Sequence, residues 1–288
     1  MSSRMGAVSR PKAAKHAALQ KLLDSLYASC NFSSRLSSDP IEFPHRYKRS
    51  SDIEVVALIA AVLAYGKVDL FKSVTERILS PMGESPADFL QGFSRKRDAK
   101  RFAGLRYRFN TNDDIIALLD AVHQLLRRYG SLKAAFFDKF HPDDVSVEKA
   151  LVGFVRDVIS IPGEPAIAPP GFLQLFPSPV KGSACKRLNL FLRWMVRDKD
   201  IDFGLWTEIP KSSLVVPLDL HIGRIARCFG LTSRKSDDWK TAVEITDSLS
   251  AFCPEDPLRY DFALCHMGIS GGCGEKHCPT CDTRKWLV

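Results

Sequence analysis

Lys186 and Asp219 are the two residues whose types and surroundings best fit catalysis. Lys186 follows the small-residue turn 182–185, and Asp219 opens an apolar helical segment 33 residues later. A lysine that is partly desolvated by apolar neighbours loses its proton more easily, and the neutral amine can attack carbon. A buried carboxylate at a helix start can stabilise positive charge that develops on a sugar. The ordinary alternative is a lysine that opens an exposed helix and an aspartate that caps one.

Several residues near this pair could contact a nucleic-acid backbone. The first turn of the helix that Lys186 opens offers free N–H groups and a positive dipole end, and both suit a phosphate. Helical spacing places Lys186, Arg193 and Arg197 on one stripe of that helix. Two further polar residues follow Asp219 within its own helix. The predicted DNA contacts are therefore Gly182, Ser183, Arg187, Arg193, Arg197, His221 and Arg224.

The charge of the chain favours a polyanionic partner. Its formal net charge is +8, and every phosphate that Lys or Arg neutralises releases bound counterions. No apolar run approaches the ~20 residues that cross a membrane. The basic N-terminal stretch lacks the apolar core of a secretion signal, so we expect a cytoplasmic protein in a reducing compartment.

Four cysteines gather near the C-terminus. Their spacing, with a Cys-x-x-Cys pair and histidines nearby, suits tetrahedral zinc or a [4Fe–4S] cluster, and the choice between the two stays open. The alternative is a set of reduced thiols in a terminal tail. The predicted metal ligands are Cys265, Cys273, Cys278 and Cys281.

Apolar residues recur at helical spacing along most of the chain, which predicts an all-α protein. We expect a flexible basic arm over 1–15, a single two-lobed helical domain over 16–268 and a Cys-rich tail over 269–288. The Pro-rich segment 161–182 is predicted to be a loop that crosses between the lobes, because proline cannot sit inside a regular helix. Helices are predicted at 16–27, 51–66, 68–79, 112–130, 132–140, 146–159, 184–197, 219–229, 237–252 and 257–267, with a short one from Pro86.

The basic segment 95–109 alternates cations with aromatic residues. Phe102, Tyr107 and Phe109 are interleaved with arginines there. Two interpretations are open, a solvated face with aromatic anchors beneath it and a track for phosphates. We favour the first, because long cationic side chains commonly cover apolar surface.

Two segments of the chain resemble the helix-hairpin-helix DNA glycosylase superfamily, the relatives of endonuclease III. The segment VPLDLHIGRIARCFGL, which contains Asp219, resembles that superfamily's aspartate motif, and GSACKRL, which contains Lys186, is similar to its lysine hairpin. The long separation between lysine and aspartate most resembles the archaeal 8-oxoguanine glycosylase branch. KRLNLFLRWMVR, DFGLW, PLDLH and DPLRYDFAL look like a family of uncharacterised bacterial proteins, over about 46–268.

The resemblance implies a fold and a role for each matching residue. The fold would be the two-lobed helix-hairpin-helix type, with Lys186 as the Schiff-base nucleophile and Asp219 as its assisting carboxylate. Asp261 would read the extruded base, although a first-turn helix carboxylate is an equal alternative. Cys265 stands where the archaeal branch stacks a Trp on the base. Tyr65 is the candidate for filling the gap that a flipped base leaves, and Trp194 and Trp206 are alternative stacking residues for which core packing is favoured.

The chain departs from the superfamily pattern at its hairpin. Ala184 replaces the second glycine, and no amide side chain stands near Tyr65 to fill the gap. The first hypothesis is a monomeric base-excision glycosylase with β-lyase activity on damaged duplex DNA, acting on an oxidised purine and needing no catalytic cofactor. The second is a DNA- or RNA-binding module on the same scaffold, and the third is an adaptor whose charge only maintains solubility.

Overall fold

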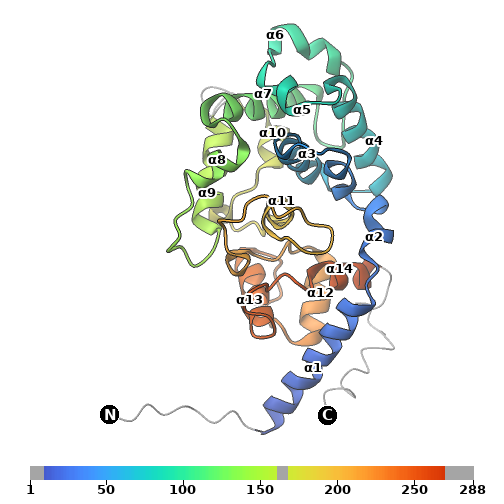
Figure 1. Cartoon of the computed structure of the whole chain (residues 1–288), viewed down its shortest axis with the longest axis vertical. Helices are drawn as coiled ribbons and strands as arrows, with labels where there is room; N and C mark the ends of the chain where they lie inside the picture. Colours follow the sequence, from blue (N-terminus) through green and yellow to red (C-terminus); the bar gives the residue numbers. More distant parts are fainter. Residues whose placement is uncertain (1–9, 161–167, 270–288) are drawn as a thin grey trace.

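Every regular element in the described part of the chain is helical. The computed structural model describes residues 10–160 and 168–269, and helices run through these residues without a β-strand (Figure 1). The prediction of an all-α protein is therefore confirmed for them. Within these ranges, no helix combines the length and the apolar character that crossing a membrane would require.

The first group of helices forms the upper part of the molecule in Figure 1. Along the chain, this group begins with α2 and three 3-10 turns. The bounds are α2 Phe32–Arg35, η1 Leu36–Ser38, η2 Pro40–Glu42, η3 Pro44–Arg46, α3 Ser50–Leu63, α4 Val68–Leu79, η4 Ser80–Met82, α5 Pro86–Gln91, α6 Arg95–Asp98, η5 Ala99–Phe102, α7 Asn112–Tyr129, α8 Leu132–Phe137, α9 Glu148–Ser160 and α10 Pro170–Leu175.

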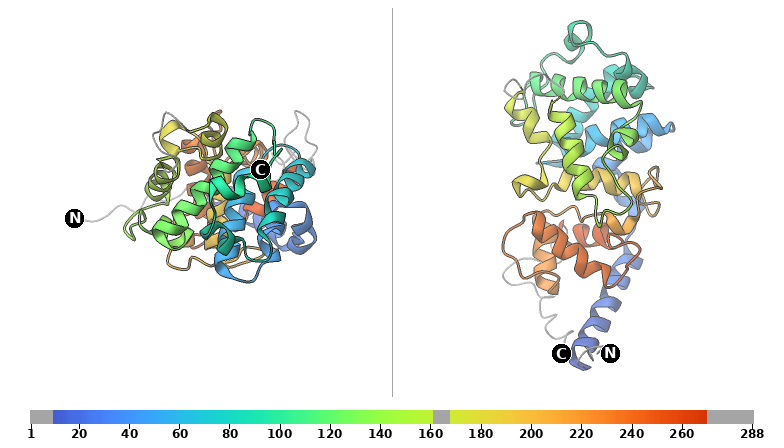
Figure 2. Two further views of the ribbon diagram at one scale, coloured as in Figure 1. Left: turned by 90° about the horizontal axis from the view of Figure 1, so that it is seen from above. Right: turned by 90° about the vertical axis from the view of Figure 1, so that its left-hand side faces the viewer.

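The second group lies below the first, and the two ends of the described chain meet in it. Helices α1 and α14 pack together there, as do α12 and α14 (Figures 1 and 2). Helix α11 lies between the two groups and packs on α3. The bounds are α1 Arg10–Ser29, η6 Pro179–Lys181, α11 Lys186–Val196, η7 Lys211–Ser213, α12 Leu220–Phe229, α13 Trp239–Ser250 and α14 Asp261–Ile269.

Helix α3 is the buried centre of the upper group. Its residues from Asp52 to Leu63 are all buried, which fits a helix that is apolar around most of its circumference. Its one buried glutamate, Glu54, accepts hydrogen bonds from the Lys133 N–H and from Trp206 Nε1, each at 3.1 Å. Trp206 and Trp194 are both fully buried. The core-packing interpretation of these two tryptophans therefore holds, and neither can stack on an extruded base.

Local signals fix most of the helix ends. Asp219 caps α12 as predicted, and Gly130 ends α7 with a φ of +82°. The cap of α7 is Thr111, one residue before its first helical residue. Thr111 and Asp114 form a reciprocal capping box, in which the Thr111 N–H donates to Asp114 Oδ2 at 2.7 Å.

Two predictions about segments need correction. Residues 10–15 belong to α1 and are not a flexible arm; residues 1–9 lie outside the described part of the chain. The Pro-rich segment contains a short helix, α10, which begins with Pro170 in its first turn. Proline is tolerated there because the N–H that it lacks would have no partner within the helix.

Candidate active site at the start of two helices

Lys186 and Asp219 lie side by side at the first turns of neighbouring helices. Lys186 is the first residue of α11, and Asp219 is the N-cap of α12. The distance from Lys186 Nζ to Asp219 Oδ2 is 2.9 Å, and the two side chains are 37% and 16% exposed. Residues far apart in the sequence thus form an ion pair that solvent can reach.

Asp219 serves both the helix and the ion pair. One carboxylate oxygen, Oδ1, accepts the Ile222 N–H at 2.9 Å, and the other faces the lysine. Burial by itself would raise the pKa of Asp219, but the Lys186 ammonium and the Ile222 N–H outweigh it, so that this pKa is lowered. The carboxyl is therefore ionised at neutral pH.

The charge state of Lys186 differs from the expectation of a neutral amine. Burial alone would lower the pKa of Lys186, as the sequence suggested. The adjacent Asp219 carboxylate opposes burial and wins, so that the pKa of Lys186 is raised above its usual value. The lysine is consequently an ammonium in the resting protein, and attack on carbon requires that its proton leave first.

The turn that leads into α11 is conformationally unusual. Gly182 and Cys185 both adopt the left-handed region, with φ values of 76° and 49°. Such a conformation is costly for a residue with a Cβ. Cys185 is buried, and its thiol donates to the Pro177 carbonyl at 3.3 Å. Gly182 is exposed, accepts the Trp239 N–H at 3.2 Å and has open space around its Cα. Ser183 pairs with Asp238 in an isolated bridge, which ties the turn to the start of α13.

Arg193 and Arg197 lie inside the protein, contrary to the prediction that they contact DNA. They are 3% and 2% exposed. Arg193 Nη1 lies 2.7 Å from Asp261 Oδ2 and Nη2 lies 3.2 Å from Asp202 Oδ1. Arg197 also pairs with Asp202, and its Nε lies 2.9 Å from Asp256 Oδ1. We call these five residues the buried ion cluster.

Asp261 belongs to this cluster, so its predicted role in reading a base is also corrected. Its carboxylate is buried and is held by Arg193. Burial raises the pKa of Asp261, and Arg193 counteracts that rise only in part. Of the two alternatives left open by the sequence, the helix carboxylate in the first turn of α14 is the one that the contacts support.

Arg187 and Tyr65 are engaged with each other rather than with open solvent. Arg187 donates to the carbonyls of Val62 and Gln174, and its Cζ lies 5.0 Å from the centre of the Tyr65 ring. The Tyr65 hydroxyl donates to Asn110 Oδ1. Neither residue is free to take the predicted role, a phosphate contact for Arg187 and a gap-filling wedge for Tyr65.

Two of the predicted DNA contacts remain on the surface beside Asp219. Arg224 is exposed and His221 is half-buried, both on α12. His221 packs closely against Gly268 of α14, where an added Cβ would lie 2.9 Å from His221 Cβ. In the turn that precedes Lys186, Gly182 is also exposed and Ser183 is half-buried.

Cys265 is the one predicted metal ligand that the structure describes. The other three, Cys273, Cys278 and Cys281, lie outside the described residues. Burial raises the pKa of the Cys265 thiol, and the nearby Asp219 and Asp261 carboxylates raise it further. Within residues 10–160 and 168–269, no group of three or more potential ligands could hold a metal ion. A metal bound by the four cysteines stays a prediction, and Cys265 would have to lose its proton to take part.

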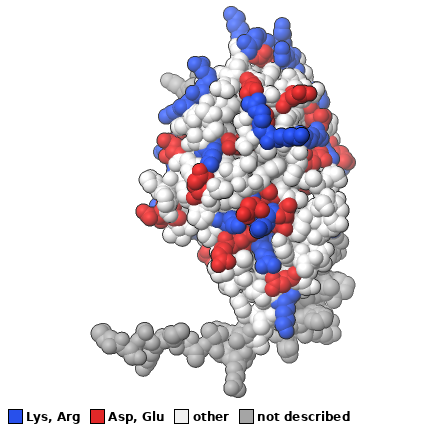
Figure 3. Space-filling model, in the orientation of Figure 1, with Lys and Arg blue, Asp and Glu red and all other residues white. Residues whose placement is uncertain are grey.

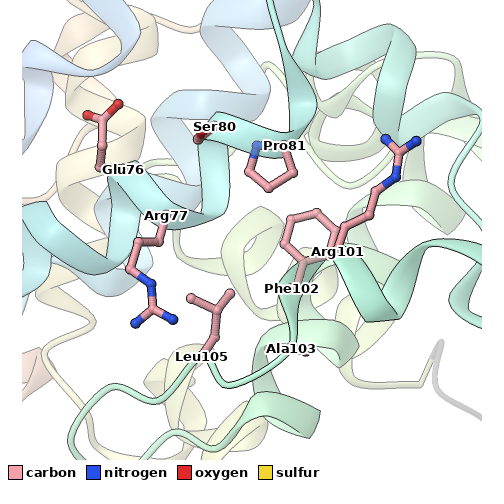
Figure 4. Close-up of a pocket in the computed structure, with 8 residues that line it drawn as sticks. All are labelled: Glu76, Arg77, Ser80, Pro81, Arg101, Phe102, Ala103 and Leu105. Atoms are coloured by element: carbon pink, nitrogen blue, oxygen red, sulfur yellow. The ribbon is translucent and has the colours of Figure 1, made fainter.

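A separate pocket of about 310 Å³ lies in the upper group, between α4, η4 and η5 (Figure 4). Arg77 and Arg101 stand on opposite sides of it, and Arg77 Nη2 donates to the Gly104 carbonyl at 3.3 Å. Lys186 and Asp219 do not line this pocket. Its residues do not contribute to the ion pair.

Sequence reasoning missed Asp202 and the turn 107–110. Asp202 is fully buried between Arg193 and Arg197, and a signal existed in the acidic run DKDID that follows them. For the turn 107–110 the sequence contains a weaker signal, which is the alternation of aromatic and cationic residues over 95–109. That pattern did not show which aromatic residues face outward.

Together these observations define a protein that is helical in its regular elements over 10–160 and 168–269, with a solvent-accessible ammonium–carboxylate pair at two helix starts. The chain belongs to a family described as "Protein of unknown function (DUF2400)", whose model matches residues 39–270. The matched range includes both Lys186 and Asp219. Searches among curated proteins and among solved structures found no match.

Proposed function

We propose that this protein is a DNA base-excision glycosylase with associated lyase activity, in which Lys186 is the nucleophile and Asp219 its assisting carboxylate. The observation that carries the proposal is the 2.9 Å ion pair, formed by residues 33 positions apart and still open to solvent. A lysine that only opened an exposed helix would need no such partner.

The proposed reaction begins with a proton transfer from Lys186 to Asp219 or to water. The Nζ lone pair then forms a bond to the deoxyribose C1′, the glycosidic bond breaks, and its electrons leave with the base nitrogen, which takes up a proton. Transfer of a second Nζ proton to O4′, as the C1′–O4′ bond opens, gives an iminium and a free 4′ hydroxyl. Removal of a C2′ proton then expels the 3′ phosphate, and water releases the sugar from the lysine.

The N-terminal ends of the two helices would stabilise a bound phosphate electrostatically, without a metal ion or cofactor. The positive dipole ends of α11 and α12 both point toward the ion pair, which favours a phosphate close to it. Gly182, His221 and Arg224 are the surface groups beside the pair that could contact the DNA backbone. Arg187, Arg193 and Arg197 are not included, because their side chains are committed to interior contacts.

The proposed substrate is an oxidised purine such as 8-oxoguanine in duplex DNA. This choice rests on the resemblance to the archaeal branch of the superfamily. Cys265, which interacts electrostatically with Asp219 and Lys186, would lie beside the extruded base. Its protonated thiol is a small, weakly polar group that a base could contact.

A non-catalytic DNA- or RNA-binding module is the second candidate, and the charge of Lys186 favours it. A lysine whose pKa is raised is a permanent cation at neutral pH, and a permanent cation suits a phosphate contact. The two candidates differ in whether a covalent adduct can form.

Borohydride trapping tests the proposal. The wild-type protein is incubated with duplex DNA that carries one 8-oxoguanine, beside Lys186→Gln and beside Lys181→Gln, which removes an exposed lysine just before the same turn. We expect a trapped adduct with the wild type and with Lys181→Gln, and none with Lys186→Gln. An adduct that persists in Lys186→Gln would assign the nucleophile to another amine. Binding without adduct or strand cleavage across a panel of lesions would reject the enzyme in favour of the binding module.

A further inference from the structure

The turn 107–110 presents an exposed aromatic side chain among cations. Phe109 is 67% exposed, whereas Phe102 and Tyr107 of the same segment are buried. The interpretation of aromatic anchors beneath a solvated face therefore holds for two of these three aromatics and fails for Phe109. Its ring is therefore the aromatic surface of this turn that a partner molecule could reach.

Hydrogen bonds of the residues on both sides hold the turn that carries Phe109. Residues Tyr107 and Asn110 exchange two backbone hydrogen bonds, of 2.9 and 2.8 Å. Asn110 Nδ2 donates to the Gly171 carbonyl at 2.7 Å, and the Tyr107 hydroxyl donates to the Tyr65 carbonyl. Arg108, with a φ of 50°, occupies the left-handed position between them.

A ladder of rings and guanidinium groups connects Phe109 with the neighbour of Lys186. The Arg108 Cζ lies 5.5 Å from the centre of the Phe109 ring and 5.9 Å from that of Tyr65. The Arg187 Cζ lies 5.0 Å from the same Tyr65 ring. The sequence of groups is therefore Arg187, Tyr65, Arg108 and Phe109, with Phe109 at the solvent end.

The chain segment that leads to Phe109 is strongly cationic. The segment from Arg95 to Arg108 contains seven Lys or Arg residues and a single Asp. All seven cations are exposed, and the basic side chains gather at the α6 end of the molecule (Figure 3). Because the Arg108 guanidinium lies beside the Phe109 ring, a partner that stacks on Phe109 and also carries negative charge would be favoured.

We propose that Phe109 stacks on an unpaired nucleobase of a bound DNA strand, while the cations of 95–108 contact its phosphates. A nucleobase has the flat π-face that would extend the ladder, and its backbone supplies the negative charge that the surrounding surface favours. The inference shares its DNA partner with the proposed function, but it does not depend on chemistry at Lys186.

The test uses the full chain and a single-stranded oligonucleotide that carries one 2-aminopurine, with the same sequence as an intact duplex for comparison. We expect the wild type to bind the single strand and to quench the 2-aminopurine fluorescence. Phe109→Ala should bind about 5- to 150-fold more weakly and lose the quenching, which is the range for loss of one base–aromatic stack. Phe109→Trp should retain both, and Val145→Ala, which trims another exposed apolar residue, should match the wild type.

Several outcomes would overturn the inference. Phe109→Ala that binds and quenches like the wild type would reject the stacking role, and a wild type that binds no oligonucleotide would reject the DNA partner altogether. Trapping assays separate this failure from failure of the proposed function. An adduct that forms normally in a Phe109→Ala protein with unaltered binding would leave the glycosylase proposal standing alone. Phe109-dependent quenching without any adduct would leave the stacking site standing alone.

Discussion

Helix α11 carries two kinds of ion pair, and they differ in what surrounds them. At its first residue, Lys186 pairs with Asp219 where solvent reaches both side chains. Two turns further along, Arg193 pairs with Asp202 and Asp261 in the protein interior, where all three are nearly inaccessible. The sequence places Lys186 and Arg193 on the same stripe of the helix, and both are cations. The two cations therefore differ only in how far their surroundings expose them to solvent.

The contrast shows that an ion pair can serve stability or chemistry, depending on its exposure. In the buried ion cluster, loss of one partner would strand a carboxylate in a medium of low dielectric constant. At Lys186, water reaches the pair and screens it in part, so that its contribution to folding is smaller than that of the buried cluster and either member can exchange protons with solvent. The accessible pair is thus the one able to exchange protons with a substrate.

The largest expected effect concerns the carboxylate of the accessible pair. Asp219→Asn should lower the rate of adduct trapping by about 10²- to 10⁴-fold, which is the usual contribution of a positioned proton-transfer group. Asparagine is as good an N-cap as aspartate, so that α12 should remain intact. Single-turnover trapping with excess protein measures this rate.

The pH profile sharpens this prediction. With Asp219 present, the raised pKa of Lys186 means that trapping should accelerate as pH rises, because the neutral amine becomes more abundant. In Asp219→Asn the pKa of Lys186 should fall, because the carboxylate that opposes the effect of burial is gone, and the rise in rate should move to lower pH. A variant whose rate and profile equal those of the wild type would show that Asp219 only caps the helix.

The second prediction concerns the buried ion cluster. Arg193→Met should lower the free energy of unfolding by about 3–5 kcal/mol, because Asp202 and Asp261 would lose a buried partner. Urea denaturation followed by circular dichroism measures the change. Arg156→Met removes an exposed arginine of α9 and should alter stability by no more than about 0.5 kcal/mol. Equal stability of the two variants would contradict the structural role of the cluster.

The smallest expected effect is that of Lys186 on folding. After allowance for solvent screening, Lys186→Gln should change the free energy of unfolding by less than about 1 kcal/mol at neutral pH. The pair's contribution has a defined window, because the pKa of Asp219 is lowered and that of Lys186 is raised. It should be lost as pH falls below the usual aspartate range, and lost again as pH rises past the usual lysine range. Denaturation of Lys186→Gln and wild type at acidic, neutral and alkaline pH measures this difference. A large loss of stability of Lys186→Gln at neutral pH would show that the accessible pair stabilises the fold as the buried ion cluster does.

Most of the helices could be predicted from the sequence because their signals are local. The bounds of α4, 68–79, coincide with the prediction, and Asp219 caps α12 as expected. Apolar spacing and capping residues act within one or two turns, so no distant neighbour is needed to read them. The prediction of a continuous loop over 161–182 was wrong at α10 for a local reason too. Its prolines indicated a loop, but a proline can occupy the first turn of a short helix.

The candidate site could be predicted only in part. The sequence determined that Lys186 and Asp219 each begin a helix, and the tertiary structure decided that the two helix starts meet. It also decided that Arg193 and Arg197 are interior, because their partners Asp202, Asp256 and Asp261 arrive from segments beyond α11. Helical periodicity assigns a residue to a face of its own helix. Whether that face meets water or carboxylates from distant segments depends on how the helices pack, and this decides both the burial and the charge state of each residue.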